Sequence, residues 1–285
     1  MAELISGKIV SEKLRFEIKS QVEDFKDRYE YAPGLAVVMV GDNPASAVYV
    51  RNKHRACLEV GIESYQIECP ESISEDELLS KIDELNADEK VSGILVQLPL
   101  PSHIDEQKVI ERIDPKKDVD AFHPSNVGRI TIGNYDFLPC TPSGIISLLD
   151  HYGIEIAGKR CVVIGRSNIV GKPMALLLTE RHGTVTLCHS RTVGLKEICL
   201  DADIIVVAIG RAEFLRADMV KEGTVVIDVG INRVDGVLVG DVAFDEVSKK
   251  ASMITPVPGG VGPMTITTLL KNTLLAAKLQ IKDHI

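Results

Sequence analysis

The sequence predicts an α/β protein with two domains, an arrangement that two observations support. Short apolar runs alternate with longer segments of helical periodicity along most of the chain. This alternation is typical of strand–helix units that assemble into a mostly parallel sheet. The length of 285 residues is also about twice that of a typical domain.

The first half of the chain contains helix and strand signals in turn. A helix is expected at residues 4–29, with Ser11 as a possible early cap. Pro44 suits the first turn of a helix over 44–60, and SEDE at 74–77 is a capping box that opens a helix over 74–87. Strands are expected between these helices, at residues 34–40, 64–68 and 93–97.

Residues 114–142 break the alternation. Their Asp-Pro, His-Pro and Leu-Pro steps, with Gly128 and Gly133, predict a long irregular stretch. Such a stretch is usually functional or a domain junction, and we expect both. We therefore expect a first domain at residues 1–138, completed by a C-terminal helix at 265–285, and a second domain at residues 139–264.

The second domain resumes the alternation. A clear helix is expected at 171–182, VDGV at 234–237 resembles a hairpin turn, and a loop at 255–263 precedes the final helix at 265–281. Strands are expected at residues 160–165, 184–188, 203–208 and 224–229.

Charge and cysteine usage exclude several classes of function. A net charge of −9 argues against nucleic acid or an anionic membrane as a partner. The six cysteines form no CxxC pair, which predicts reduced thiols without a disulfide framework or a zinc site. Since neither a charged leader nor a bilayer-length apolar run is visible, we expect a cytoplasmic protein.

The segment GRSNIVG at 165–171 joins an expected strand to an expected helix, which is the context of a dinucleotide fingerprint. Its GxSxxxG spacing is weak evidence, because an ordinary strand–helix turn also uses glycine. The next strand ends in Ser190 and Arg191, with no acid to receive ribose hydroxyls. These two residues and Arg166 could instead bind a 2′-phosphate, so the second domain is expected to be a Rossmann-like domain that binds NADP.

The first domain carries a polar stripe on the helix after Pro44. Ser46, Tyr49 and Lys53 are spaced i, i+3 and i+7, so they share one face near the carboxyl edge of the sheet. Gln97 follows another strand and could bond a lysine without holding it as a cation. The alternative interpretation is that Lys53 is an ordinary surface lysine and Tyr49 an ordinary half-buried packing residue.

Two loops could also contact a ligand. Asp118 and Asp120 could bind an amino-pyrimidine-like ring through paired N–H groups, although turns use Asp equally well. The loop TPVPGGVGPM at 255–264 has several glycines and prolines just before a helix, and such loops close over flat or anionic ligands.

Several blocks in one order make the chain similar to the bifunctional methylenetetrahydrofolate dehydrogenase/methenyltetrahydrofolate cyclohydrolase family. The blocks are GDNPASAVYVRNK (41–53), VQLPLP (96–101), KDVD (117–120), PCTP (139–142), GRSNIVG (165–171) and PVPGGVGPMT (256–265). The resemblance implies oxidation of a methylene folate by NADP⁺ and hydrolysis of the methenyl product to a formyl folate. It also implies an active-site cleft between the domains and a homodimer through the cofactor domains.

The resemblance assigns roles residue by residue. Lys53 would handle proton transfer in the hydrolysis, Gln97 would tune it, Tyr49 would hold the folate rings and Asp120 would anchor the pterin. Further folate contacts would come from Leu98, Pro99, Pro258, Gly259 and Gly260. NADP would be bound by Gly165, Arg166, Ser167, Ser190 and Arg191, with Ile231 near the nicotinamide.

Two positions depart from the family pattern. Ala121 follows Asp120 where Gly is expected, and RAE at 211–213 lacks an expected proline. Two alternatives stay open: a two-domain dehydrogenase of the shikimate or amino-acid type, and a nucleotide-binding module without catalysis. The first would lack the Gly-Pro loop before the last helix, and the second would not need Tyr49, Lys53 and Gln97.

Overall fold

The computed structural model describes residues 1–282 and divides into two compact units, each with its own sheet. The six-stranded unit contains residues 1–12, 130–133 and 139–265. The three-stranded unit contains residues 13–129, 134–138 and the chain from Ile266 onward. Within residues 1–282, every helix is too short or too polar to cross a membrane. The last three residues of the expected C-terminal helix, 283–285, lie outside the described part.

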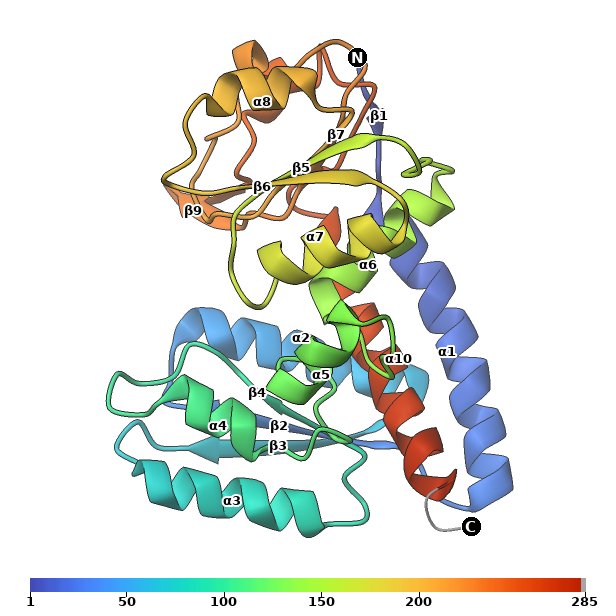
Figure 1. Ribbon diagram of the computed structural model, residues 1–285. Helices are drawn as coiled ribbons and strands as arrows, with labels where there is room; N and C mark the ends of the chain where they lie inside the picture. The colour runs from blue at the N-terminus through green and yellow to red at the C-terminus, as the bar shows by residue number, and fades with distance from the viewer. Residues whose placement is uncertain (283–285) are drawn as a thin grey trace. The chain divides into compact units, whose positions relative to one another are not determined.

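The three-stranded unit is built on a parallel sheet of order β3-β2-β4. Its strands are β2 (Gly34–Val40), β3 (Glu63–Cys69) and β4 (Gly93–Val96). Helices α2 (Pro44–Val60) and α3 (Glu75–Ala87) lie on opposite faces of this sheet (Figure 1). Because both faces are covered, the central strand is apolar along its whole length. Leu78 and Ile82 of α3 and Val109 of α4 (Glu106–Arg112) pack against Val38 and Ile94.

The expected starts of two helices are confirmed, and one is wrong. Helix α2 begins at Pro44, and the capping box of α3 is present, with Ser74 and Glu77 each bonding the other's backbone N–H. Leu4, where the first helix was expected to begin, instead lies in strand β1 (Glu3–Leu4), which pairs with β11 (Met253–Ile254). Helix α1 (Gly7–Tyr29) starts after it, so Ser11 lies inside the helix and donates to the Lys8 carbonyl.

The stretch 114–142 is more regular than expected. It contains α5 (Pro124–Thr131) and the first turn of α6 (Cys140–His151). The backbone N–H of His123 donates to the Asp118 carboxylate at 2.8 Å, just before Pro124 opens α5. Pro124 of the His-Pro step is therefore the first residue of a helix, a position that proline favours, and Pro139 of the Leu-Pro step is the N-cap of α6.

The six-stranded unit has the sheet order β1-β11-β8-β7-β5-β6, parallel throughout. Helices α6 and α7 (Gly171–Glu180) lie on one face and α8 (Leu195–Asp201) on the other (Figure 1). The chain passes from β5 to β6 on one side and then back to β7 on the other, so the order reverses beside β5. Ligands of open α/β sheets bind at such a reversal, outside the carboxyl ends of the strands. The central strands are β5 (Arg160–Ile164), β6 (Thr184–Cys188), β7 (Ile204–Val207) and β8 (Val225–Asp228).

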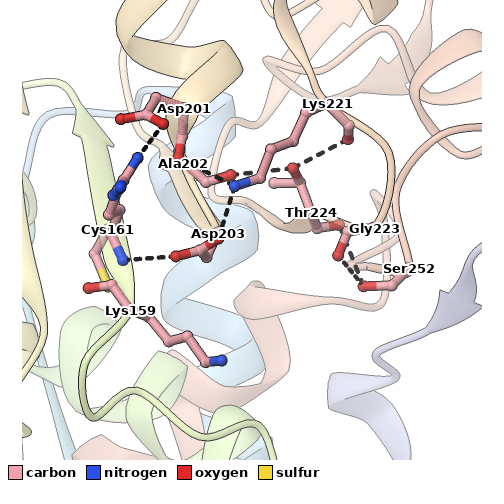
Figure 2. A network of polar contacts seen from close by, with 10 residues as sticks. Lys159, Cys161, Asp201, Ala202, Asp203, Lys221, Gly223, Thr224 and Ser252 are labelled. Atoms are coloured by element: carbon pink, nitrogen blue, oxygen red, sulfur yellow. Dashed lines mark hydrogen bonds and ion pairs between the residues drawn. The ribbon is translucent and has the colours of Figure 1, made fainter.

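A polar network closes the amino end of this sheet (Figure 2). The Lys221 ammonium donates to the Asp203 carboxylate at 2.7 Å and to the Asp201 carbonyl at 3.1 Å. The other Asp203 oxygen accepts the backbone N–H of Arg160 at 2.9 Å, and the Thr224 hydroxyl donates to the Ala202 carbonyl at 3.2 Å. These bonds join the starts of β5, β7 and β8 at the edge opposite the carboxyl ends of the strands.

The remaining elements of this unit are short. The expected hairpin turn is confirmed: β9 (Asn232–Val234) and β10 (Val237–Val239) pair antiparallel around Asp235 and Gly236, both at positive φ. This geometry suits a two-residue hairpin loop. A 3₁₀ turn (Ala217–Met219) and α9 (Phe244–Val247) follow β7 and β10. Helix α10 (Val261–Lys282) begins earlier than the expected residue 265.

Candidate functional site

The polar side chains of the three-stranded unit meet where β4 ends. The Lys53 ammonium donates to the Gln97 side-chain oxygen at 3.0 Å. The Gln97 amide nitrogen donates in turn to the carbonyl of Leu98 at 2.7 Å. This second bond settles which way the amide points, because only its oxygen is left to face the lysine. Lys53 is 9% exposed and Gln97 is half-buried.

This contact lies at the carboxyl edge of the sheet. Gln97 follows β4 directly, and its backbone N–H donates to the Val38 carbonyl of β2 at 2.8 Å. Since β3 and β4 flank β2 on opposite sides, the strand order reverses here as well. The sequence-predicted pair of Lys53 and Gln97 is thus brought together at the edge where ligands of such sheets bind.

The backbone bond from Gln97 to Val38 extends the β2–β4 ladder by one residue beyond the last strand pair. It holds the amide at the end of a rigid strand rather than on a free loop. Leu98, whose carbonyl fixes the amide, is half-buried, and Pro99 after it is exposed and follows a cis peptide bond.

The rest of the polar stripe on α2 divides into a buried and an exposed part. Ser46 is buried, and its backbone N–H donates to the Asn43 side chain at 3.3 Å, which caps the helix. Tyr49 is 38% exposed, and partial burial raises the pKa of its phenol. Tyr49 therefore presents a protonated hydroxyl on a partly exposed ring, one helical turn before Lys53.

The two aspartates of the KDVD block have different environments. Asp118 is buried, and its carboxylate accepts from the His123 backbone and the Asn126 amide, both at 2.8 Å. Desolvation raises the pKa of Asp118, and these hydrogen bonds oppose the shift. Asp118 is thus a structural residue, contrary to its expected part in gripping a ring, whereas Asp120 is half-exposed.

Ala121, where Gly was expected, keeps the turn that a glycine would make. Its φ is 58°, in the left-handed region, and its side chain is fully buried. For an L-residue this conformation costs about 1–2 kcal/mol. The substitution therefore leaves the backbone path beside Asp120 in place and stores strain in it.

In the six-stranded unit, the glycine turn after β5 lies against the end of β7. Gly165 has φ +122°, and a Cβ there would lie 2.2 Å from the Ala208 carbonyl oxygen. A Cβ on Gly171 would lie 2.0 Å from the Gly165 carbonyl oxygen. The Ser167 hydroxyl oxygen accepts the N–H groups of Val170 and Gly171 at 3.2 and 3.3 Å, at the start of α7. Only glycine fits at both ends of this turn.

The predicted phosphate-binding residues are exposed on neighbouring loops of that edge. Arg166 is in the glycine turn, and Ser190 and Arg191 follow β6, which pairs with β5. Neither arginine forms an ion pair with any residue of the described chain, unlike Arg160 and Arg181 in the same unit. The backbone N–H of Arg191 donates to the His189 ring at 3.1 Å, which shapes the loop. Two uncompensated cations are therefore available to an anionic group.

The Gly-Pro loop before α10 also belongs to this unit. Gly259 has φ +101°, and its carbonyl accepts the Lys8 N–H at 3.1 Å. A Cβ on Gly7 would lie 1.7 Å from the Gly260 carbonyl oxygen, so the loop packs directly on the start of α1. Pro258 follows a cis peptide bond and is exposed.

Sequence reasoning missed two buried carboxylates near this loop. Asp228 ends β8, and Asp241 follows β10; both are buried, at 3% and 0% exposure. Desolvation raises the pKa of Asp228 to about 6, with the charge of Asp241 adding to the shift and three backbone N–H donors opposing it. An acid that ends an otherwise apolar buried strand was the available signal for Asp228. Asp241 has no comparable signal.

Both parts of the chain match models of one family. Residues 5–120 match the catalytic domain of tetrahydrofolate dehydrogenase/cyclohydrolase, and residues 139–281 match the NAD(P)-binding domain of the same family. The bifunctional protein FolD of Acetivibrio thermocellus is 59% identical over 282 residues, which cover 99% of each chain.

Solved structures agree with these matches. The crystal structure of a bifunctional FolD enzyme from Campylobacter jejuni is 51% identical, with a TM-score of 0.96 over 98% of this chain and all of that one. A Trypanosoma brucei methylenetetrahydrofolate dehydrogenase-cyclohydrolase, complexed with NADP cofactor and inhibitor, is 40% identical, with a TM-score of 0.95 over 99% of each chain. A shikimate dehydrogenase from Aquifex aeolicus, at 15% identity and a TM-score of 0.54, shares the fold alone. The chain belongs to the tetrahydrofolate dehydrogenase/cyclohydrolase family.

Proposed function

We propose that this protein oxidises 5,10-methylenetetrahydrofolate with NADP⁺ and hydrolyses the methenyl product to 10-formyltetrahydrofolate. The observation that carries the proposal is the bond from Lys53 to Gln97, fixed by Leu98 at the carboxyl edge of a parallel sheet. It places one amine, nearly buried, against an uncharged acceptor. We assign the folate chemistry to the three-stranded unit and NADP binding to the six-stranded unit.

The hydrolysis requires a group that can accept and return a proton. Water adds to the methenyl carbon of the folate, and the Lys53 amine accepts a proton from it. The resulting ammonium returns a proton to the ring nitrogen as its bond to that carbon breaks, and a second proton leaves to solvent as the formyl C=O forms. A carboxylate partner would hold the lysine as a cation, whereas the Gln97 oxygen orients it without adding charge.

Further residues are proposed to bind the folate. The partly exposed ring and hydroxyl of Tyr49 suit stacking and hydrogen bonding to a flat ring, and the half-exposed Asp120 can accept paired N–H groups of the pterin. Leu98, Pro99 and the loop residues Pro258, Gly259 and Gly260 are proposed as further folate contacts.

The turn after β5 fits a dinucleotide. Backbone atoms occupy the positions that a Cβ would take at Gly165 and Gly171, so the turn is tightly packed and carries no side chain there. It leads into the N-terminus of α7, and helix N-termini favour phosphate groups. When bound, NADP⁺ supplies the acceptor for the hydride of the methylene carbon. The folate nitrogens already activate that carbon, so the protein's task is to hold and orient both reactants. We propose that Gly165, Arg166, Ser167, Ser190 and Arg191 bind the cofactor, with Ile231 beside its nicotinamide.

The lysine assignment is tested by Lys53→Gln, with Arg55→Gln as the matched control. Arg55 is an exposed cation on the same helix. We expect Lys53→Gln to abolish hydrolysis of methenyltetrahydrofolate, followed by its absorbance, while the circular dichroism spectrum is kept. Arg55→Gln should hydrolyse it at the wild-type rate. Unchanged hydrolysis by folded Lys53→Gln would refute the assignment.

The cofactor assignment is tested by Arg191→Ala, with the exposed Arg216→Ala as its control. A hydrogen bond to a charged group contributes about 1.5–3 kcal/mol, so kcat/KM for NADP⁺ should fall about 10- to 100-fold. The value for NAD⁺, which has no 2′-phosphate, should stay within about twofold. Equal kcat/KM values of the wild-type enzyme for NADP⁺ and NAD⁺ would contradict the assignment.

We also propose a cytoplasmic homodimer formed through the cofactor-binding units. Strand β6 ends the six-stranded sheet, and within the described chain no strand pairs with its outer side. An open edge of this kind can pair with a second copy. The six cysteines are free and buried, which suits a reducing compartment. Light scattering should give twice the 31.1 kDa chain mass for the wild-type protein. Thr186→Lys, on the exposed edge strand, should give the mass of the monomer. If this variant is still a dimer, the β6 edge is not the interface.

A further inference from the structure

Asp241 holds the loop that follows β7. One carboxylate oxygen accepts the backbone N–H groups of Ile209 and Gly210 at 2.7 and 2.9 Å. The other accepts the Arg211 backbone N–H at 2.8 Å and the Asn232 side-chain amide at 2.9 Å. These four donors match the roughly four acceptor sites that a carboxylate offers. Three of the donors are the consecutive backbone N–H groups of residues 209–211, so the carboxylate fixes the conformation of this loop.

Asp228 holds Asp241 in turn. Its carboxylate accepts the backbone N–H groups of Gly230 and Asp241, both at 2.9 Å, and of Val242 at 3.0 Å. Its own backbone N–H donates to the Thr255 hydroxyl at 2.7 Å. Thr255 immediately precedes the Gly-Pro loop, so one buried network joins the loops that follow β7, β8 and β11.

Two glycines allow this close approach. A Cβ on Gly230 would lie 2.2 Å from the Asp241 carboxylate, and a Cβ on Gly240 would lie 1.7 Å from the Asp228 carboxylate. No side-chain cation of the described chain forms an ion pair with either acid; the Arg211 guanidinium lies over the Phe214 ring, 5.1 Å from its centre. Backbone N–H groups and one side-chain amide therefore offset the desolvation of both buried carboxyl groups. Because these donors must point at the carboxyl oxygens, the loops that carry them need a well-defined geometry.

One of the loops held in this way lies against the glycine turn, where the dinucleotide is expected. The loop after β7 starts at Ala208, whose carbonyl lies against Gly165 of the glycine turn. Ile231 lies between Gly230 and Asn232, both bonded to the network, and is 48% exposed despite being a large apolar side chain. Fixing the residues on both sides of Ile231 fixes where its side chain points.

We propose that Asp241 is a positioning residue for hydride transfer, which holds the 209–211 loop and Ile231 against the nicotinamide half of the cofactor. The proposal rests on the assignment of Ile231 to the nicotinamide. Its role differs from that proposed for Arg166 and Arg191, which is to bind the phosphate of the other half. Loss of Asp241 is expected to impair the orientation of the nicotinamide more than the affinity for the whole cofactor.

The test replaces Asp241 by Asn, which keeps the shape but points an NH₂ group at backbone donors. We expect the dehydrogenase kcat to fall at least about tenfold, the KM for NADP⁺ to change less than about threefold, and NADP-independent hydrolysis of methenyltetrahydrofolate to stay within about twofold. Arg191→Ala should show the opposite split, with a raised KM and a retained kcat. A general structural defect would lower both activities together.

Two measurements do not depend on turnover. In the free protein, hydrogen exchange of the 209–211 amides should be about tenfold faster in Asp241→Asn than in wild type, since their acceptor is weakened. The fluorescence of bound NADPH should shift, because the surroundings of the nicotinamide change, with a Kd within about threefold of wild type.

If Asp241→Asn does not fold, Asn232→Ala decides the question, because it removes one of the four donors and leaves the loop bonds in place. It should lower the dehydrogenase kcat about two- to fivefold and leave hydrolysis unchanged. An unchanged kcat in the folded variants, or equal losses in both activities, would overturn the positioning role. A wild-type protein without dehydrogenase activity would instead refute the proposed function itself.

Discussion

Replacing Gln97 by Glu tests whether the lysine needs an uncharged partner. The change places a carboxylate where the Gln97 oxygen now accepts from Lys53 at 3.0 Å. At that separation and an effective dielectric constant of about 20, the attraction between an ammonium and a carboxylate is about 5 kcal/mol. Burying the new charge offsets part of this, so we take a net preference of about 3 kcal/mol for the cationic lysine.

A preference of about 3 kcal/mol removes about 99% of the proton-accepting amine, since 1.36 kcal/mol is a factor of ten. Hydrolysis of methenyltetrahydrofolate at neutral pH should therefore slow about 100-fold. The difference in rate between wild type and variant should narrow in alkali, because alkali removes the proton that the new carboxylate holds on the lysine. The second Glu oxygen would face the Leu98 carbonyl, now 2.7 Å from the amide nitrogen, and this repulsion adds to the loss.

The assay follows methenyltetrahydrofolate absorbance for wild type, Gln97→Glu and Gln97→Met. The Met variant removes the hydrogen bond without adding charge, so it should lose less activity than the Glu variant and keep the wild-type pH dependence. Hydrolysis by Gln97→Glu within about threefold of wild type at neutral pH would refute the reasoning.

Three further predictions concern the fold around the sites. Gly165→Ala should abolish NADPH binding or destabilise the protein by several kcal/mol, because its Cβ would lie 2.2 Å from the Ala208 carbonyl; a folded variant with wild-type Kd by fluorescence titration would contradict this. Since burial raises the pKa of Asp228 from 3.8 to about 6, the native state binds its proton more tightly, so stability should fall by at most about 3 kcal/mol as pH rises from about 4 to about 6. Urea unfolding should show a shallower fall for Asp228→Asn, and identical slopes would exclude this contribution. Ala121→Gly should change stability by less than about 1 kcal/mol, because relief of the strain at φ 58° is offset by the lost methyl burial and the freer unfolded chain; a larger loss in thermal unfolding would mean that the turn is not strained.

Local signals predicted much of the fold. The start of α2 at Pro44 and the Ser74 capping box depend on residues a few positions apart, and both are confirmed. The strand β2 was predicted with its observed bounds because a short apolar run buried on both faces has few other interpretations. The turn at Asp235 and Gly236 likewise follows from the backbone freedom of its own residues.

The errors lie where distant segments decide the structure. Residues 3–4 form a strand only because Met253 and Ile254, far along the chain, offer an open edge. The proline steps of 114–142 predicted a loop, but the Asp118 carboxylate stabilises the start of α5 through bonds to His123 and Asn126. Asp118 and Asp120 are indistinguishable as letters of the sequence, and only the folded chain buries the first and leaves the second half-exposed.

The sequence by itself determined the order of most strands and helices, the glycine turn, and the chemical types present at each sheet edge, because these depend on local periodicity and on recognisable blocks. Only the tertiary structure decided that the Gln97 oxygen faces Lys53 and that Asp241 binds the peptide groups of 209–211. Both depend on contacts between residues at least 30 positions apart. The first depends on which way the Gln97 amide is turned, and the second on backbone N–H groups, which every sequence contains. Backbone donors have no letter of their own, so their use becomes visible only once the chain is folded.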